Sequence, residues 1–216
     1  MLYFSPMPNE VEIKFIIHDL AALQSKLKST GFREITPRTH EMNTLYDTPS
    51  QDLRRRGELL RLRQYGDRWI LTHKSKIVSQ SEVVIPSAAR NPYPQDNASG
   101  DPSKHKSRTE LETIVADGPT TDAIIRALGY SPSFRYEKFR AEWTDGTGHV
   151  VLDETPIGNI AEIEGPPDWI DHTAALLGIG ERDYITSNYA ALFFEWKART
   201  GAAAMNMTFD EVGQAI

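Results

Sequence analysis

Polar and apolar residues alternate strictly in several short segments of the chain. In the first, residues 10–15 read EVEIKF, so the charged side chains share one face of a strand and the apolar side chains share the other. The same alternation recurs at residues 59–63, 69–74, 108–112, 138–142, 151–153 and 161–164. Because charge returns at alternate positions in each segment, the pattern predicts β-strands with one charged face and one largely apolar face.

Four further segments carry apolar residues at helical spacing and end near a glycine, which is typical of a helix C-terminus. They cover residues 19–30, 121–128, 166–178 and 187–200. Asp19 is a candidate N-cap for the first helix, and Thr120 or Thr121 for the second. We expect the apolar stripes of these helices to pack against the apolar face of the strands, which predicts an α+β fold.

Two arrangements of the strands satisfy this pattern. An open sheet exposes its charged face to water and covers its apolar face with helices. A closed barrel instead places the charged faces inside and carries the helices on its apolar outside. Because each unpaired buried ion costs several kcal/mol, the barrel requires a wet interior that binds a charged ligand.

The composition of the 216-residue chain excludes some classes of function. It has 24 Lys and Arg against 30 Asp and Glu, a formal net charge of -6, so bulk electrostatic binding of nucleic acid is not expected. The absence of cysteine excludes disulfides, thiolate metal sites and cysteine nucleophiles. We find neither a signal-peptide pattern nor an apolar run of the roughly 20 residues that a membrane span needs, and we expect a cytoplasmic protein without a membrane partner.

The chain divides into one domain, one interruption within it and a tail. The domain covers residues 8–200 and contains all the predicted strands and helices. Residues 86–107 contain four prolines and no Leu, Ile, Val, Phe or Met, so we expect a disordered loop. Its Lys104, His105 and Lys106 are expected to be solvated, with contact at the mouth of the lumen as the alternative. Residues 201–216 are expected to form a weakly ordered tail, although its Met and Phe side chains are candidates to dock on a groove.

The charged faces carry acids and bases in nearly equal numbers. The eight acids are Glu10, Glu12, Glu110, Glu112, Glu142, Asp153, Glu162 and Glu164. The seven bases are Lys14, Arg61, Arg63, Lys74, Arg108, Lys138 and Arg140. Arginine side chains suit phosphate oxygens, and carboxylates two residues apart suit hard cations such as Mg²⁺ or Mn²⁺. The set is therefore compatible with a metal–polyphosphate complex, with an ordinary solvated sheet as the alternative.

The order of these motifs resembles that of the CYTH superfamily, the triphosphate tunnel metalloenzymes. EVEIK at residues 10–14 matches the ExExK pattern near the N-terminus of that family. The motifs that follow in family order are YDTP at residues 46–49, Arg61 with Arg63, Lys74, the strand at residues 108–112, Lys138 with Arg140, LDE at residues 152–154 and EIEG at residues 162–165. The resemblance covers roughly residues 8–198. It implies an eight-stranded antiparallel β-barrel around a charged tunnel, with the helices outside.

The resemblance also implies roles for the charged residues. Those implied as metal ligands are Glu10, Glu12, Asp153, Glu162 and Glu164. Those implied as a phosphate cradle are Lys14, Arg61, Arg63, Lys74, Arg108, Lys138 and Arg140. Glu110 and Glu112 are left to orient these bases or a second metal, and Lys74 is a candidate to orient the attacking water.

Three neighbouring polar residues are expected to lie outside the site. Glu154 directly follows Asp153 and therefore points to the opposite face of its strand, and His73 also points outward. Asp47 lies in a sequence that favours a turn. Any single base of the cradle has the alternative of merely pairing with a facing glutamate.

The resemblance implies chemistry on triphosphates with Mg²⁺ or Mn²⁺. We expect a triphosphatase that acts on ATP, thiamine triphosphate or tripolyphosphate. The alternatives are a class IV-type adenylate cyclase, which converts ATP to cyclic AMP and pyrophosphate, and a non-catalytic polyphosphate-binding module. The carboxylates favour an enzyme over the module, and a homodimer is compatible with the family.

Overall fold

The computed structural model describes residues 10–76 and 105–213, and of Glu10, Lys76 and Ser107 it describes the backbone alone. Strands and helices alternate along these ranges. In chain order they are β1 (Glu10–Ile16), α1 (Leu20–Ser29), β2 (Arg33–Asp47), α2 (Asp52–Arg56), β3 (Leu59–Tyr65), β4 (Arg68–Lys76), β5 (Lys106–Val115), α3 (Gly118–Ala127), β6 (Ser131–Thr144), β7 (His149–Thr155), β8 (Gly158–Glu164), α4 (Pro167–Leu177), the 3-10 helix η1 (Glu181–Asp183), α5 (Tyr189–Thr200) and α6 (Phe209–Gly213).

The strands form a closed antiparallel barrel in the order β1-β5-β4-β3-β2-β6-β7-β8. β1 pairs along one edge with β8, from Glu12 opposite Glu164 to Ile16 opposite Ile160. Along its other edge β1 pairs with the start of β5, where Glu12 lies opposite Lys106. The predicted α+β fold with an eight-stranded antiparallel barrel is thus confirmed, and the open sheet is excluded.

The apolar faces of the strands point outward, as the barrel requires. Ile13 and Phe15 of β1 are buried in a first core cluster that includes Leu27 of α1 and Ile170 of α4. A second cluster joins β6 to α5, and a third joins β3 to α3. Because the helices cover the apolar faces, the interior of the barrel is left to the charged faces.

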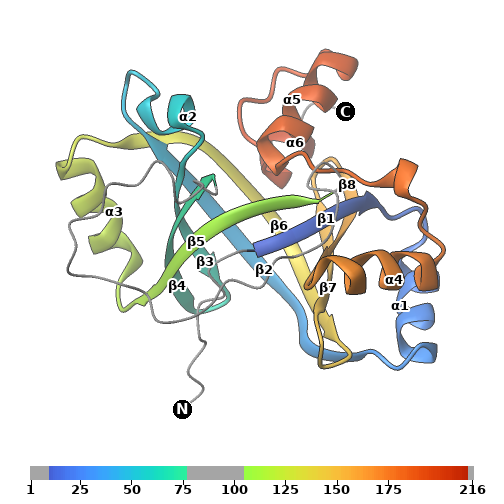
Figure 1. Cartoon of the computed structure of the whole chain (residues 1–216). Helices are drawn as coiled ribbons and strands as arrows, with labels where there is room; N and C mark the ends of the chain where they lie inside the picture. The colour runs from blue at the N-terminus through green and yellow to red at the C-terminus, as the bar shows by residue number, and fades with distance from the viewer. Residues whose placement is uncertain (1–9, 77–104, 214–216) are drawn as a thin grey trace.

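The helices surround the barrel on several sides. Figure 1 shows α1 and α4 together against β1 and β8, α3 beside the β3–β5 side, and α5 and α6 together at the top of the view. Asp19 caps α1 as predicted. α3 begins earlier than predicted, because Asp117, rather than Thr120 or Thr121, accepts the capping hydrogen bond from the backbone. Among the described residues, no helix combines the length and the apolar character needed to cross a membrane.

β2 is the strand that the alternation pattern missed. It is 15 residues long and pairs with both β3 and β6. Its ladder with β6 shifts register between Glu34 and Thr39, a region that contains Pro37. A proline removes a ladder donor and a bulge moves side chains to the other face, so the alternation is broken there. Glu41 and Asn43 follow the irregular region and point into the barrel.

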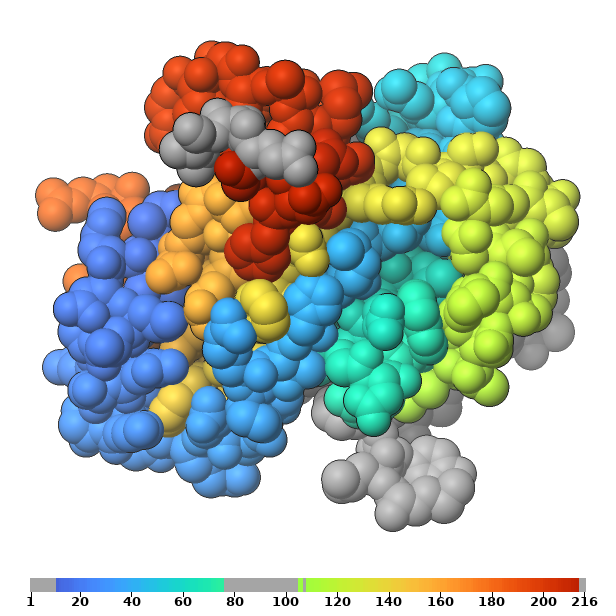
Figure 2. All heavy atoms as spheres, turned by 180° about the vertical axis from the view of Figure 1, so that it is seen from behind, coloured from blue at the N-terminus to red at the C-terminus, as the bar shows by residue number. Residues whose placement is uncertain are grey.

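The residues after Gly201 pack against the barrel, which differs from the weakly ordered tail that we expected. Met207 is fully buried in the second core cluster, and its backbone forms a parallel bridge with Tyr136 of β6. Val212 of α6 is buried in the same cluster. Figure 2 shows this C-terminal segment, in red, lying over the residues of β6. The tail therefore docks on β6 through Met207, which is the alternative that its Met and Phe side chains offered.

Residues 86–104 of the proline-rich stretch lie outside the described residues, and the predicted disordered loop falls mainly on them. His105 and Lys106 differ from the solvated loop that we expected, and Lys106 adopts the alternative, contact with the lumen. His105 is buried, and its Nε2 lies 2.9 Å from Oδ1 of Asp171 on α4. Lys106 begins β5, and its ammonium contacts Glu12 inside the barrel. β5 therefore starts within the predicted loop, since both side chains find partners on the barrel and α4.

Candidate functional site

Six charged side chains from β1, β6, β7 and β8 meet inside the barrel, and we call them the first network. They are Glu12, Lys14, Lys138, Arg140, Asp153 and Glu162. Lys14 Nζ lies 2.7 Å from Glu12 Oε1 and 3.1 Å from Glu162 Oε1. Arg140 donates to Asp153 at 2.6 and 2.7 Å and to Glu162 at 2.6 Å. The strand register explains these contacts, because Lys14 lies opposite Glu162 and Arg140 lies opposite Asp153.

Burial and pairing act in opposite directions on the ionisable groups of the first network. Burial favours the neutral carboxyl of Glu12, but the ammonium groups of Lys14 and Lys106 outweigh it and lower the pKa of Glu12 to about 2. Burial is likewise outweighed at Glu162, whose pKa lies well below its ordinary value. Burial disfavours the charge of Lys14, yet its two carboxylate partners raise its pKa. These three groups therefore remain ionised near neutral pH.

A second network of charged side chains comes from β3, β4 and β5. Its members are Arg61, Arg63, Lys74, Glu110 and Glu112. Lys74 Nζ lies 3.0 Å from Glu110, and Arg61 lies 3.6 Å from both Glu110 and Glu112. Arg63 donates to Glu112 at 3.1 and 3.2 Å. Glu110 and Glu112 thus contact the bases of this wall of the barrel.

Glu41 of β2 lies between the two networks. Its carboxylate is 3.6 Å from Lys138 and 3.9 Å from Arg140 of the first network, and 3.8 Å from Arg63 of the second. Burial would raise its pKa, but the surrounding cations hold the pKa well below its ordinary value. Glu41 was not predicted as a site residue, because the alternation of β2 is broken before it. The polar residues Glu41 and Asn43 on either side of Met42 are the local pattern that could have placed it on the charged face.

Tyr189 brings a hydroxyl group from α5 into the first network. The hydroxyl donates to Asp153, and Lys138 Nζ lies 4.4 Å from the centre of its ring. The ring stacks on Tyr136 at 5.6 Å between centres, and the Tyr136 hydroxyl accepts from Arg61 at 3.4 Å. The apolar stripe of α5 predicted packing alone. The contact of Tyr189 with Asp153 could not be predicted, because no local pattern shows that the first residue of a helix reaches the interior of a barrel.

Three predicted site residues, Glu10, Glu164 and Arg108, are described by their strand positions and, for Arg108, by one contact. Glu10 lies opposite Arg108 at the start of β1, and its side chain is outside the described part of the chain. Glu164 lies opposite Glu12 on β8 and is half-buried. Arg108 is half-buried and donates to the backbone oxygen of Gly57 at 3.3 Å, so it contacts the turn before β3.

Three polar residues that we expected outside the site do lie outside it. Glu154 pairs with Arg38 at 2.6 Å on the outer surface. His73 is partly exposed, 3.6 Å from Glu58. Asp47 accepts hydrogen bonds of 2.9 and 3.0 Å from backbone N–H groups at the start of α2, which confirms its role in a turn.

The predicted metal ligands fit a divalent cation only in part. In the described portion of the chain, no group of three or more His, Asp or Glu side chains is arranged to hold a metal ion. Glu12 and Glu162 do converge on one point, the ammonium of Lys14, and carboxylate oxygens are the donors that Mg²⁺ and Mn²⁺ prefer. Both oxygens of Asp153 already accept hydrogen bonds. Oδ1 accepts from Arg140, and Oδ2 accepts from Lys138 and Tyr189. Glu162 is engaged at both oxygens as well, by Lys14 and by Arg140, so what sets Glu12 and Glu162 apart is only that their carboxylates share one position, the one that Lys14 holds.

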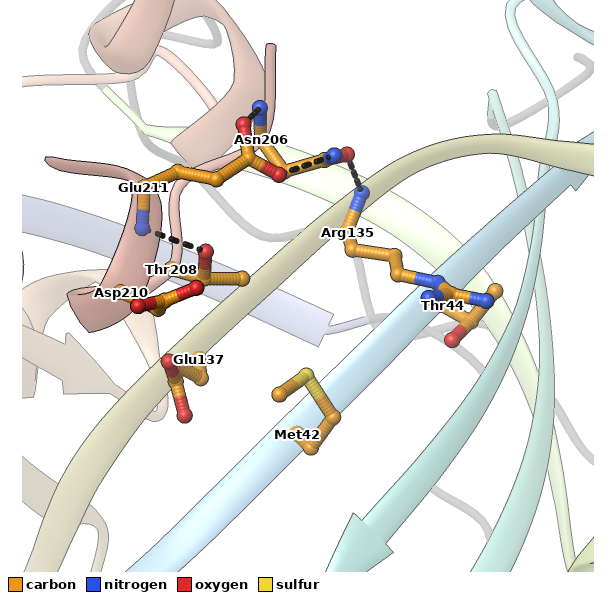
Figure 3. A pocket seen from close by; sticks show the side chains of 8 residues that line it. All are labelled: Met42, Thr44, Arg135, Glu137, Asn206, Thr208, Asp210 and Glu211. Atoms are coloured by element: carbon orange, nitrogen blue, oxygen red, sulfur yellow. Dashed lines mark hydrogen bonds between the residues drawn. The ribbon is translucent and has the colours of Figure 1, made fainter. Parts of the chain in front are cut away.

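A separate cavity of about 340 Å³ lies outside the barrel, between β2, β6 and the C-terminal segment (Figure 3). It is lined by Met42, Thr44, Arg135, Glu137, Asn206, Thr208, Asp210 and Glu211. Met42 and Thr44 alternate with the lumen residue Glu41 and so belong to the opposite face of β2. Glu211 binds the side chain of Asn206 at 2.7 Å within the C-terminal segment. This cavity therefore marks the attachment of that segment and is distinct from the charged lumen.

Comparison with known proteins relates the chain to others of similar fold. Residues 8–165 match the family profile described as "CYTH domain". A search of curated proteins found no significant relative. A "putative adenylate cyclase" from Vibrio parahaemolyticus has a TM-score of 0.66 and 17% identity, covering 86% of this chain and 97% of that chain. For the PH1819 protein from Pyrococcus horikoshii, the TM-score is 0.62 and the identity 20%, with 86% and 98% covered. These similarities show a shared fold.

Proposed function

The chain belongs to the CYTH domain family, and on that basis we propose that it is a divalent-metal-dependent enzyme that hydrolyses a triphosphate bound inside its barrel. Proteins of this family include triphosphatases and proteins described as adenylate cyclases. The observation that carries the proposal is the arrangement of the lumen. Lysines and arginines from five strands, β1, β3, β4, β5 and β6, surround one interior, and carboxylates of both networks hold them there. A polyanion with several phosphate groups is the ligand that such a lumen suits.

In this proposal the bases bind the phosphate oxygens and reduce the charge that develops on them. Arg61, Arg63 and Arg140 offer planar guanidinium groups, and Lys138 offers a single ammonium. Their carboxylate partners fix them before the substrate arrives, so less reorganisation is needed at the moment of reaction. Lys74 is proposed to orient the water that attacks the terminal phosphorus. Arg108 is proposed to contact the substrate near the β3 turn.

Glu12 and Glu162 are proposed to hold the divalent cation, Mg²⁺ or Mn²⁺, with Glu10 and Glu164 as further candidates. When bound, such a cation neutralises phosphate oxygens and polarises them. Lys14 lies between the carboxylates of Glu12 and Glu162. Its ammonium therefore competes for the same oxygens, and we expect it to move toward the phosphate when the cation is present.

Product analysis tests the proposed reaction. The purified full chain is incubated with tripolyphosphate, ATP or thiamine triphosphate, with Mg²⁺ or Mn²⁺, and the products are separated by ion chromatography. Release of inorganic phosphate supports the triphosphatase, whereas cyclic AMP with pyrophosphate would establish the cyclase alternative. Binding of tripolyphosphate without turnover of any triphosphate would leave a polyphosphate-binding module.

Two matched variants link the reaction to the lumen. Glu12→Gln removes a proposed metal ligand and is expected to abolish metal-dependent turnover. Glu154→Gln removes an acid of similar size from the outer surface, where it pairs with Arg38 at 2.6 Å, and is expected to retain turnover. Equal activity of the two variants would show that the reaction does not take place at the proposed metal pair.

A further inference from the structure

We propose that Glu41 is a positioning residue of the triphosphate site, whose carboxylate holds Arg63, Lys138 and Arg140 in place while leaving hydrogen-bond donors of these cations available to phosphate. The inference rests on the proposed function, since it concerns the same cations. Glu41 acts here through its neighbours and does not itself contact the substrate.

Glu41 differs from the acids of the first network in its distance from the cations. Asp153 and Glu162 each accept hydrogen bonds of 2.6 to 2.7 Å from Arg140. The carboxylate of Glu41 lies 3.6 to 3.9 Å from its cations, which is beyond hydrogen-bond distance. Within residues 10–76 and 105–213 its one side-chain hydrogen bond is 2.8 Å long and comes from Asn43. Because charge attraction persists at these distances in a buried site, Glu41 holds the cations without consuming their N–H groups.

Buried polar atoms without hydrogen-bond partners gather on the same wall of the barrel. Among the described residues they are Glu41 Oε2, Asn43 Oδ1, Arg61 Nε and Arg63 Nε on β2 and β3, together with Trp143 Nε1. Asn43 lies opposite Arg63 in the strand register. Unpartnered buried polar groups are costly and uncommon, so four on two adjacent strands call for an explanation. The two unpartnered Nε groups show that the carboxylates of the lumen do not saturate the donors of Arg61 and Arg63.

The position of Glu41 in the barrel allows it to set the spacing of the two networks. β2 lies between β3, which carries Arg63, and β6, which carries Lys138 and Arg140. A phosphate chain that contacts both walls at once needs these cations at a fixed separation. Displacing catalytic groups by about 1 Å can cost about a hundredfold in rate, so a shared counter-ion at this position has a direct effect on turnover.

The test compares three variants of the full chain, with steady-state hydrolysis of tripolyphosphate and calorimetric binding of tripolyphosphate as readouts. Glu41→Gln keeps the shape of the side chain and removes its charge. We expect kcat to fall about tenfold, because the cations are no longer held, while tripolyphosphate binds about threefold more tightly, because a competing anion is gone. Glu41→Asp keeps the charge and is expected to recover part of kcat. Glu154→Gln is the control, since Glu154 pairs with Arg38 at 2.6 Å on the outer surface, and it is expected to leave both kcat and affinity unchanged.

Opposite effects on turnover and binding distinguish positioning from a structural role. A merely structural acid would weaken binding, turnover and thermal stability together when replaced, and this result would overturn the proposal. An unchanged kcat and affinity for Glu41→Gln would also overturn it. If Glu41→Gln does not fold, an unchanged kcat for Glu41→Asp would count against positioning, and a reduced kcat at unchanged affinity would support it.

The same experiment separates this inference from the proposed function. If the wild-type chain binds tripolyphosphate but does not hydrolyse it, the enzyme proposal fails. The positioning proposal is then decided by affinity alone: tighter binding by Glu41→Gln supports it, and equal or weaker binding overturns it. If the wild-type chain does not bind tripolyphosphate, both proposals fail.

Discussion

Replacing Glu12 by Gln changes how the stability of the protein depends on acid, and the structure allows the size of the effect to be worked out. Glu12 is 5% exposed and contacts the ammonium groups of Lys14 and Lys106. Its burial is outweighed by these cations, so its pKa falls from the ordinary 4.5 to about 2 in the folded protein. The glutamine variant has no titrating group at this position and therefore lacks this contribution.

The magnitude follows from the difference between the folded and unfolded pKa values. The pKa of about 2 against 4.5 is a difference of about 2.5, and each pKa unit is worth about 1.4 kcal/mol, so the linked free energy is roughly 3 to 4 kcal/mol. Because the folded pKa is the lower one, this stabilisation is present above about pH 4.5 and is lost as the pH falls toward 2. We therefore expect Glu12→Gln to be roughly 3 to 4 kcal/mol less stable than wild type at pH 7 and nearly equal to it at pH 2.

Denaturant unfolding, measured at a series of pH values from 7 to 2, gives the free energy of unfolding of both proteins. Glu154→Gln is the matched control, because its partner Arg38 is half-exposed and a surface ion pair contributes at most about 1 kcal/mol. A stability difference between wild type and Glu12→Gln that stays constant from pH 7 to pH 2 would refute the reasoning. It would show that Glu12 is not held ionised by the lysines of the lumen.

Three further changes test other parts of the structure. In steady-state kinetics, Arg63→Ala is expected to raise KM about 10- to 100-fold with a smaller effect on kcat, because it removes charged donors to phosphate. An unchanged KM would contradict the role of Arg63 in binding phosphate. Met207→Ala should lower the free energy of unfolding by about 2–4 kcal/mol, because Met207 is fully buried. Met205→Ala, at a 69% exposed position, should change it by less than about 0.5 kcal/mol. Equal losses would contradict the docked C-terminal segment. Gly118→Ala is expected to cost about 1–3 kcal/mol in the same assay, because its Cβ would lie 2.0 Å from the ring of Trp69; a fully stable variant would contradict that packing.

Local sequence pattern was enough to predict most strands and helices of this protein. Alternation in residues 10–15 and in the six similar segments reports directly which side chains share a face, because side chains of a strand alternate between two sides. The four helix predictions succeeded for a similar reason, with errors at their ends such as the cap of α3. β2 was missed where Pro37 and shifted register break the alternation, and the tail was misjudged because its few apolar residues bury themselves against a distant strand.

The choice between barrel and open sheet did not follow from the pattern alone, since both satisfy the same alternation. The family resemblance implied the barrel, and pairing of β1 with β8 established it. The charged residues of the candidate site were likewise only partly predictable. The bases of β1, β3, β4 and β6 were predicted from their spacing and motif order, because each motif lies within one strand.

Alternation within each strand predicted which residues carry charge on one face, whether that face lay inside a barrel or against water. Which of these charges meet depends on how the barrel closes. Glu41 contacts residues of β3 and β6, and Tyr189 contacts Asp153 from a helix that begins 36 residues later. Such contacts depend on the order and register of strands around the closed barrel, which are set by long-range pairing and packing and leave no local pattern in the chain.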